Sequence, residues 1–405
     1  MTISAPPSPP RPGSAVNHEE PIEKTRRRGR LRQMSIAACV VAAAVGAAIF
    51  FGIHLRGGIN GRSAPSQGES SGLVALTRVG GAGAKDHIVL VDPSGRSSPR
   101  DLGPGWGPSW SPDGRRLVFT YEVGSDSMYG GGVGAVLGRG LGGGLERLFV
   151  MNADGGERHL LAMPWLRSAR FEDSAPAWSP DGSRIAFTRT IWPVGTAHTQ
   201  WTPGRSALYV LDFAHGGPQR VSIPLDDQSG PVTWSPDGKL LAYTSPASRS
   251  PCPVLHVTNA DGTGDHVLAA AGRSLGSPGG CVPILTPAWS PDGHWIAFTR
   301  LRPMKSASAF IVGRGPEVLE GHLDLYLISP DGKRLHRLTH QPNLIGVAPT
   351  WSPDGKRVAF ESGRVGDPDP LQALVDVIDR DGSHRHTILH GRGHMYGAAA
   401  WQPRQ

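Results

Sequence analysis

Apolar residues occur in this chain as short runs, each bounded by polar and turn-forming residues. Five runs follow one pattern, in which a large residue, a small or branched residue and an aromatic residue succeed one another: Leu117–Phe119, Ile185–Phe187, Leu241–Tyr243, Ile296–Phe298 and Val358–Phe360. Side chains alternate between the two faces of a strand, so the large residues of each run point one way and the small residue points the other. Runs this short, between turn residues, predict strands covered on both faces.

The same five-residue turn precedes every run. Pro fixes the backbone of the second turn position in Ser-Pro-Asp-Gly, and Gly adopts the positive φ that closes the turn, so each copy predicts a hairpin with Trp at the end of the first strand. We expect the repeated Trp, Asp and Gly to have structural roles, since one role explains all copies. They are Trp110, Asp113, Gly114, Trp178, Asp181, Gly182, Trp234, Asp237, Gly238, Trp289, Asp292, Gly293, Trp351, Asp354 and Gly355, with a truncated copy at Trp401.

A second signature completes each unit. Apolar runs such as Leu148–Met151 lead into Asp-Gly turns, here Asn152–Gly155, and then into another short strand. Each unit therefore contains four strands, two tight turns and no helix. Repetition at this period predicts four-stranded sheets arranged radially, which is an all-β propeller.

The two ends of the repeat region predict how the ring closes. Leu73–Thr77 and His87–Val91 have the pattern of the later strands of a unit that lacks its Trp strand, and the segment around Trp401 can supply that strand. Five full units and one shared unit predict a six-bladed β-propeller over residues 73–405, closed by pairing of its N- and C-terminal strands. Closure removes the exposed sheet edge that an open ring would have.

These motifs resemble the TolB-type propeller repeat, a WD40-like family of bacterial envelope proteins. The resemblance covers roughly residues 73–403 and rests on five near-perfect copies of Trp-Ser-Pro-Asp-Gly. It implies the fold and a location in the bacterial envelope. We expect no counterpart of the α/β domain that precedes the propeller in TolB.

The N-terminal region has a different composition. Residues 1–33 are Pro-rich and hold seven Lys and Arg against three Glu, which predicts a disordered cytoplasmic tail. An apolar, uncharged run follows and predicts one transmembrane helix over 34–55, with a flexible linker over 56–72. Arg residues before the helix predict a cytoplasmic N-terminus and a periplasmic or extracellular propeller in a single-pass cell-membrane protein. Cleavage as a signal peptide is the alternative.

Most of the formal net charge of +7 belongs to this tail, which contributes +4. A basic run beside a membrane helix is typical of a solvated flank, so the charge does not predict binding to nucleic acid. We expect the membrane, reached through this single N-terminal helix, and an envelope protein or peptide to be the partners of a monomeric propeller.

The lengths of the connections predict which face of the propeller binds. The turns between the first and second strands of each unit, and between the third and fourth, are short and define the short-turn face. The other connections define the long-loop face, where binding residues are expected. The longest are Tyr121–Leu145, Ala162–Ala175, Thr190–Ser206, Ser245–Pro253, Ala269–Thr286, Leu301–His322 and Ser362–Ala373.

Aromatic residues in or beside these loops are the candidate binding residues, because aromatics are enriched at binding hot spots. They are Trp165, Trp192, Trp201, Phe310 and Tyr396. The alternative is that they pack the loops onto the propeller. Cys252 and Cys281 fall in consecutive long loops and can form a disulfide outside the cytoplasm. Two free buried thiols are the alternative.

Catalytic signatures are weak. Gly68–Gly72 and Gly272–Gly276 spell Gly-x-Ser-x-Gly without the strand-turn-helix context that exposes a nucleophile. No catalytic residue, metal site or cofactor is therefore assigned. The sequence favours a protein-binding or scaffolding module, and the alternative is a propeller enzyme, a hydrolase or lyase acting on a glycan or small molecule through carboxylates and His at the channel mouth.

Overall fold

The computed structural model describes residues 72–79, 85–123, 145–161, 171–191, 205–214, 217–221, 231–246, 253–269, 272–273, 281–282, 284–303, 321–340, 344–364, 374–390 and 395–403. Within these ranges the chain forms strands and turns, and none of it forms a helix long and apolar enough to span a membrane. The segments predicted as cytoplasmic tail, transmembrane helix and linker lie outside the described residues.

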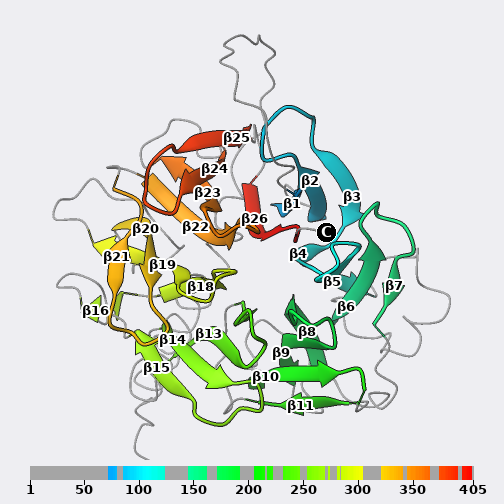
Figure 1. Ribbon diagram of the computed structural model, residues 1–405. Helices are drawn as coiled ribbons and strands as arrows, with labels where there is room; N and C mark the ends of the chain where they lie inside the picture. Colours follow the sequence, from blue (N-terminus) through cyan, green and yellow to red (C-terminus); the bar gives the residue numbers. More distant parts are fainter. Residues whose placement is uncertain are drawn as a thin grey trace, which may run out of the picture.

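Six four-stranded antiparallel sheets surround a central axis (Figure 1), which confirms the predicted all-β propeller of six blades. Blade 1 combines the C-terminal strand β26 (Met395–Trp401) with β1 (Val74–Val79), β2 (His87–Val91) and β3 (Arg100–Pro104). Blade 2 contains β4 (Trp106–Trp110), β5 (Arg116–Val123), β6 (Leu145–Asn152) and β7 (His159–Leu160). Blade 3 contains β8 (Phe171–Trp178), β9 (Arg184–Ile191), β10 (Arg205–Asp212) and β11 (Pro218–Arg220).

The remaining blades have the same order. Blade 4 contains β12 (Thr233–Trp234), β13 (Leu240–Pro246), β14 (Pro253–Asn259) and β15 (His266–Ala269). Blade 5 contains β18 (Ile284–Trp289), β19 (Ile296–Pro303), β20 (Gly321–Ile328) and β21 (Leu335–Arg337). Blade 6 contains β22 (Leu344–Trp351), β23 (Arg357–Arg364), β24 (Leu374–Asp379) and β25 (His386–His390), and a separate pair joins β16 (Gly272–Arg273) to β17 (Cys281–Val282).

Several strands are longer than the apolar runs that predicted them. β5 continues through Tyr121 to Val123, β8 already begins at Phe171, and β9 continues to Ile191. The predicted loops Tyr121–Leu145, Ala162–Ala175 and Thr190–Ser206 were therefore wrong at their ends. Polar residues such as Glu122 alternate there with buried Tyr121 and Val123, because the sheet and its apolar core both continue to the strand end.

The turn that follows each repeated Trp is built around a buried serine. The Ser235 hydroxyl donates to Asp237 (2.6 Å) and accepts the backbone N–H of Leu240 (2.9 Å). Gly238 has φ +67°, the left-handed conformation that Gly adopts without strain. Equivalent bonds occur at Ser111, Ser179, Ser290 and Ser352. In blade 3, the hydroxyl of Ser179 holds the pKa of Asp181 at about 2.

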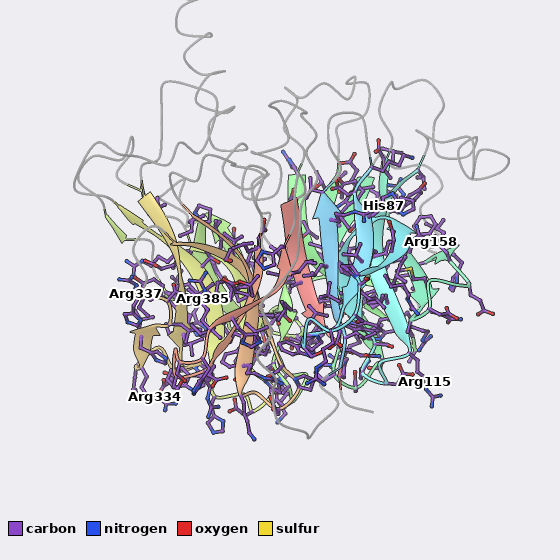
Figure 2. The ribbon with its side chains drawn as sticks, turned by 90° about the horizontal axis from the view of Figure 1, so that it is seen from above. His87, Arg115, Arg158, Arg334, Arg337 and Arg385 are labelled. Carbon is purple, nitrogen blue, oxygen red and sulfur yellow. The ribbon has the colours of Figure 1, made fainter. Side chains whose placement is uncertain are left out.

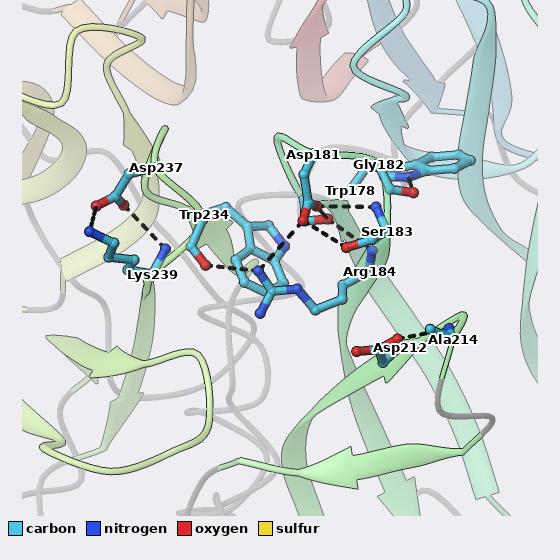
Figure 3. A network of polar contacts seen from close by, with 12 residues as sticks. Trp178, Asp181, Gly182, Ser183, Arg184, Asp212, Ala214, Trp234, Asp237 and Lys239 are labelled. Carbon is cyan, nitrogen blue, oxygen red and sulfur yellow. Dashed lines mark hydrogen bonds and ion pairs between the residues drawn. The ribbon is translucent and has the colours of Figure 1, made fainter.

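Each turn also delivers a side chain to the next blade. The residue at the start of the second strand packs beside the buried Trp of the following blade (Figure 3), as Arg184 does 4.7 Å from the centre of the Trp234 ring. Arg116 and Arg357 lie over Trp178 and Trp401 in the same way. Leu73, Leu240 and Trp295 pack against the apolar clusters that contain Trp110, Trp289 and Trp351.

Hydrogen bonds between neighbouring blades follow two alternating patterns. Where Ala precedes the Trp of one blade, its carbonyl accepts the indole N–H of the next, in the pairs Trp110 to Ala400, Trp234 to Ala177 and Trp351 to Ala288. Where Ser or Thr precedes the Trp, its hydroxyl accepts the backbone N–H of the next Trp, in the pairs Trp178 to Ser109, Trp289 to Thr233 and Trp401 to Thr350.

The inter-blade contact of Arg184 can be tested by substitution. Arg184 donates to the Gly238 carbonyl (3.0 Å) and stacks on Trp234, so Arg184→Ala should lower the free energy of unfolding by about 1–2 kcal/mol. Denaturant titration followed by tryptophan fluorescence measures this loss. Lys239→Ala is the control, because Lys239 is exposed and its 3.7 Å ion pair with Asp237 should contribute at most about 0.5 kcal/mol. Equal losses in the two variants would contradict the assigned role of Arg184.

Candidate functional site

The described residues do not test the binding aromatics predicted from the sequence. Trp165, Trp192, Trp201 and Phe310 lie outside the described residues. Tyr396 is described as a backbone position in β26, opposite Arg78 of β1. Cys252 also lies outside, and Cys281 is described only through the pairing of β17 with β16, so the disulfide stays a prediction.

A group of charged side chains lies instead where blades 2 and 3 meet. It draws on the end of β5, the start of β6, the start of β8 and the end of β9, the strand ends farthest from the Ser-Pro-Asp-Gly turns. Figure 2, turned by 90° from Figure 1, shows His87 toward this end of the strands and Arg115 and Arg334 toward the opposite end. We call this group the inter-blade cluster: Glu122, Glu146, Arg147, Phe171, Glu172, Asp173, Ser174 and Arg189.

A buried ion pair supports the cluster from blade 3. Asp173 and Arg189 lie directly opposite each other in β8 and β9 and form two hydrogen bonds, of 2.6 and 2.8 Å. Asp173 is 1% exposed, and this burial raises its pKa while the bonds from Arg189 oppose the rise. A paired geometry of this kind satisfies both charges at once.

The ring of Phe171 lies close to two guanidinium groups. Cζ of Arg147, from blade 2, is 4.1 Å from the ring centre, and Cζ of Arg189 is 4.5 Å from it. Such contacts stabilise by about 2 kcal/mol when the cation is removed from water. Phe171 therefore joins the two blades, because its ring contacts one guanidinium group from each of them.

Arg147 is only partly satisfied. Its Nη1 donates to the backbone carbonyls of Glu146 and Phe171, the second of which belongs to the next blade. Its Nη2 is buried and has no hydrogen-bond partner among the described residues. Burial lowers the pKa of Arg147, and the nearby Asp173, Glu172 and Glu146 do not reverse this effect.

Glu146 is the carboxyl group with the most altered acidity in the cluster. Burial, followed by the charges of Glu172 and Glu122, raises its pKa to about 8, although a hydrogen bond with Ser174 and the charge of Arg147 act in the opposite direction. Glu122 and Glu146 are directly opposite in β5 and β6, where like charges repel. The carboxyl group of Glu146 is therefore largely protonated at neutral pH and can donate a hydrogen bond.

A second polar group lies in blade 1 toward the same face. Asp101 accepts hydrogen bonds from Nδ1 of His87 (2.9 Å) and from Arg78 (2.5 Å). Burial acts to raise the pKa of Asp101, but hydrogen bonds from His87, the Gly103 amide and Arg78 hold it below 3.8. Within the described ranges, no three His, Cys, Asp or Glu side chains are arranged to hold a metal ion.

The sequence contains a signal for this cluster that periodicity does not capture. Glu146 and Arg147 begin an otherwise apolar strand, and Glu172 and Asp173 follow an aromatic residue at the start of another. These charged pairs lie at strand ends next to long loops, whereas the repeated Asp residues lie in tight turns. Only the packing of blade 2 against blade 3 brings them together.

The protonation of Glu146 predicts how stability depends on pH. Its pKa is higher in the folded chain than the ordinary 4.5, so the folded state holds a proton that the unfolded chain releases between about pH 4.5 and 8. Stability should fall as pH rises through this window, by up to about 1.4 kcal/mol per unit. Glu146→Gln should remove this slope in denaturant titrations repeated across the window. A slope unchanged in the variant would contradict the prediction.

Comparison with known proteins agrees with the architecture. No protein-family model matches the chain. An uncharacterized protein of Agrobacterium fabrum is 26% identical over 234 residues, 56% of this chain and 64% of that protein. A TolB homologue of Chlorobium luteolum is 37% identical over 109 residues, 21% of this chain and 25% of that protein. The chain thus spans less than two thirds of the length of these relatives.

Solved structures show the same fold. A TolB-type protein of Agrobacterium tumefaciens superposes with a TM-score of 0.50 and 19% identity, over 83% of this chain and all of that one. Hydrazine synthase of Kuenenia stuttgartiensis superposes with a TM-score of 0.55 and 15% identity, over 84% of this chain and 48% of that one. The five Trp-Ser-Pro-Asp-Gly turns, the six blades and the local similarity to TolB homologues support the resemblance to the TolB-type propeller.

Proposed function

We propose that this protein is a membrane-anchored binding module whose propeller lies outside the cytoplasm and engages an envelope protein or peptide through its long-loop face. The relatives named TolB homologues support an envelope role for the fold. Because those relatives are matched over about a quarter of their length, the residues of this chain must carry the assignment of the face.

The inter-blade cluster is the observation that carries this proposal. Burying charged groups costs free energy, and clusters with strongly altered acidities concentrate at functional sites. The repeated Asp residues of the short-turn face, by contrast, are used within their own turns, as Asp237 is by Ser235 and the Lys239 amide. The charged residues of the inter-blade cluster have no such role in a turn, and they lie toward the long-loop face.

We further infer that blade 1 closes the ring and that the helix over 34–55 precedes it. Supporting the closure, Val74 pairs with Trp401, and the Gln402 amide donates to the Leu73 carbonyl (2.8 Å). The Gln402 side chain also donates to the Gly114 carbonyl of blade 2 (2.9 Å). A closed ring has no free inner strand, which favours a monomeric propeller. The uncharged run Ser35–Ile53 supports the anchor.

The anchor can be tested by deletion. Removing residues 34–55 behind a cleavable export signal should move the chain from the membrane fraction to the soluble fraction. Immunoblotting of separated fractions measures this, and the intact chain provides the reference. Retention of the deleted form in the membrane fraction would contradict a helical anchor, whereas a shortened mature form of the intact chain would indicate signal-peptide cleavage.

The binding face can be tested with a photo-crosslinking amino acid at two matched positions. Ile191 ends β9 toward the long-loop face and is 43% exposed, and Phe213 lies at the short-turn face and is 46% exposed. Crosslinking in intact cells should join a defined envelope protein to position 191 and not to position 213. Products from position 213 alone would place the contact on the wrong face.

An enzyme remains the second candidate because Glu146 has the acidity of a general acid or base that works near neutral pH. A glycan or small molecule turned over by the purified chain would favour it. Glu146→Gln should then abolish turnover while leaving the fold intact by circular dichroism. Turnover that persists in this variant would remove Glu146 from the reaction.

A further inference from the structure

Arg147 differs from two other arginines of blades 2 and 3, the buried Arg189 and the partly buried Arg158, in the hydrogen bonds of its guanidinium group. Arg189 forms a paired ion bridge with Asp173. Arg158 stacks on Phe119 and donates through its two terminal nitrogens to the carbonyls of Pro104 and Leu102. Arg147 stacks on Phe171, and within the described part of the chain it donates through Nη1 alone and its buried Nη2 has no partner.

Arg147 also lacks a direct ion pair. Asp173 is already paired with Arg189, Glu146 is largely protonated at neutral pH, and the charge of Glu172 does not reverse the effect of burial, which lowers the pKa of Arg147. In the described part of the chain, no ion pair involves Arg147, although the residue is only 4% exposed. A buried cation without a partner costs several kcal/mol, which is offset when an anion arrives to pair with it.

We propose that Arg147 is the anchor for a carboxylate group of the polypeptide bound at the inter-blade cluster. This inference rests on the proposed binding function and specifies the chemistry recognised at the same site. An oxygen atom of a carboxylate can accept the hydrogen bond that Nη2 offers, and its negative charge can pair with the guanidinium group.

Other ligand groups fit this position less well. A cation would add positive charge beside a guanidinium group that already lacks a partner. A neutral amide carbonyl would accept one hydrogen bond and leave the charge of Arg147 unpaired. The carboxylate can come from an Asp or Glu side chain or from a chain terminus, since both present the same two oxygen atoms.

The test uses the full-length protein in detergent, with its melting temperature followed by tryptophan fluorescence. The probes are sodium acetate, acetamide of nearly the same shape, and methylammonium chloride, each titrated at constant ionic strength. Ligands that bind the folded state raise the melting temperature with their concentration. Acetate should stabilise the wild-type protein in a saturable manner, and the other two probes should not.

Substitutions assign this effect to Arg147. Arg147→Lys keeps the charge but removes the fork, and Arg147→Met removes both, so each should weaken the apparent affinity for acetate at least tenfold. Arg158→Met is the matched control, because it also removes a stacked arginine that bridges two blades, and it should change the affinity less than twofold. If Arg147→Met fails to fold, Arg147→Lys decides the question.

Two further probes distinguish the sources of the carboxylate. N-acetylglycine represents a chain terminus and N-acetylaspartate amide represents a side chain, and the probe that binds more tightly identifies the source.

Equal stabilisation by acetamide, or an acetate effect unchanged in Arg147→Lys, would overturn the proposal. Crosslinking at position 191 that persists in Arg147→Lys together with lost acetate binding would also overturn it, while leaving the binding function in place. Acetate binding without any crosslinked partner would contradict the binding function alone.

Discussion

The buried serine hydroxyl of each Ser-Pro-Asp-Gly turn is the constraint on which the arrangement of the blades depends. It bonds the Asp side chain of its own turn and the backbone N–H that begins the next strand, so the direction in which that strand starts is fixed. The first side chain of the strand is thereby placed against the Trp of the following blade. A local turn thus determines a contact between blades. Because the turn is repeated, each blade is related to the next by a similar rotation about the propeller axis.

Because the repeated turns set the contacts between blades from the short-turn face, the sequence of the long-loop face can vary. At the short-turn face the polar groups of the repeated turns are used in the turns themselves. At the opposite ends of the strands, the described residues show no side-chain bond repeated in every blade, and blades 2 and 3 place arginines and carboxyl groups there. The ion pair of Asp173 with Arg189 and the ring of Phe171 hold these groups in position. A rigid frame with an adaptable rim is a common arrangement for binding proteins.

The sequence predicted the architecture well because the information is repeated. Five copies of one motif specify strand, turn and packing together, and the structure confirms six blades of four strands. The candidate site was not predicted, because its residues occur once each. Glu122 and Phe171–Ser174 fell in predicted loops, since an apolar pattern stops before a strand does. The environment of Glu146 depends on packing between blades, which no local pattern reports.

The alternation of Ala with Ser or Thr before the repeated Trp has a consequence for how such a ring can change in size. Each blade bonds to its two neighbours in two different ways, so the smallest unit that reproduces itself is a pair of blades. Inserting or deleting one blade would place two like junctions side by side and break this alternation. A gain or loss of two adjacent blades would preserve every junction, so duplication of pairs is the route of growth compatible with this bonding.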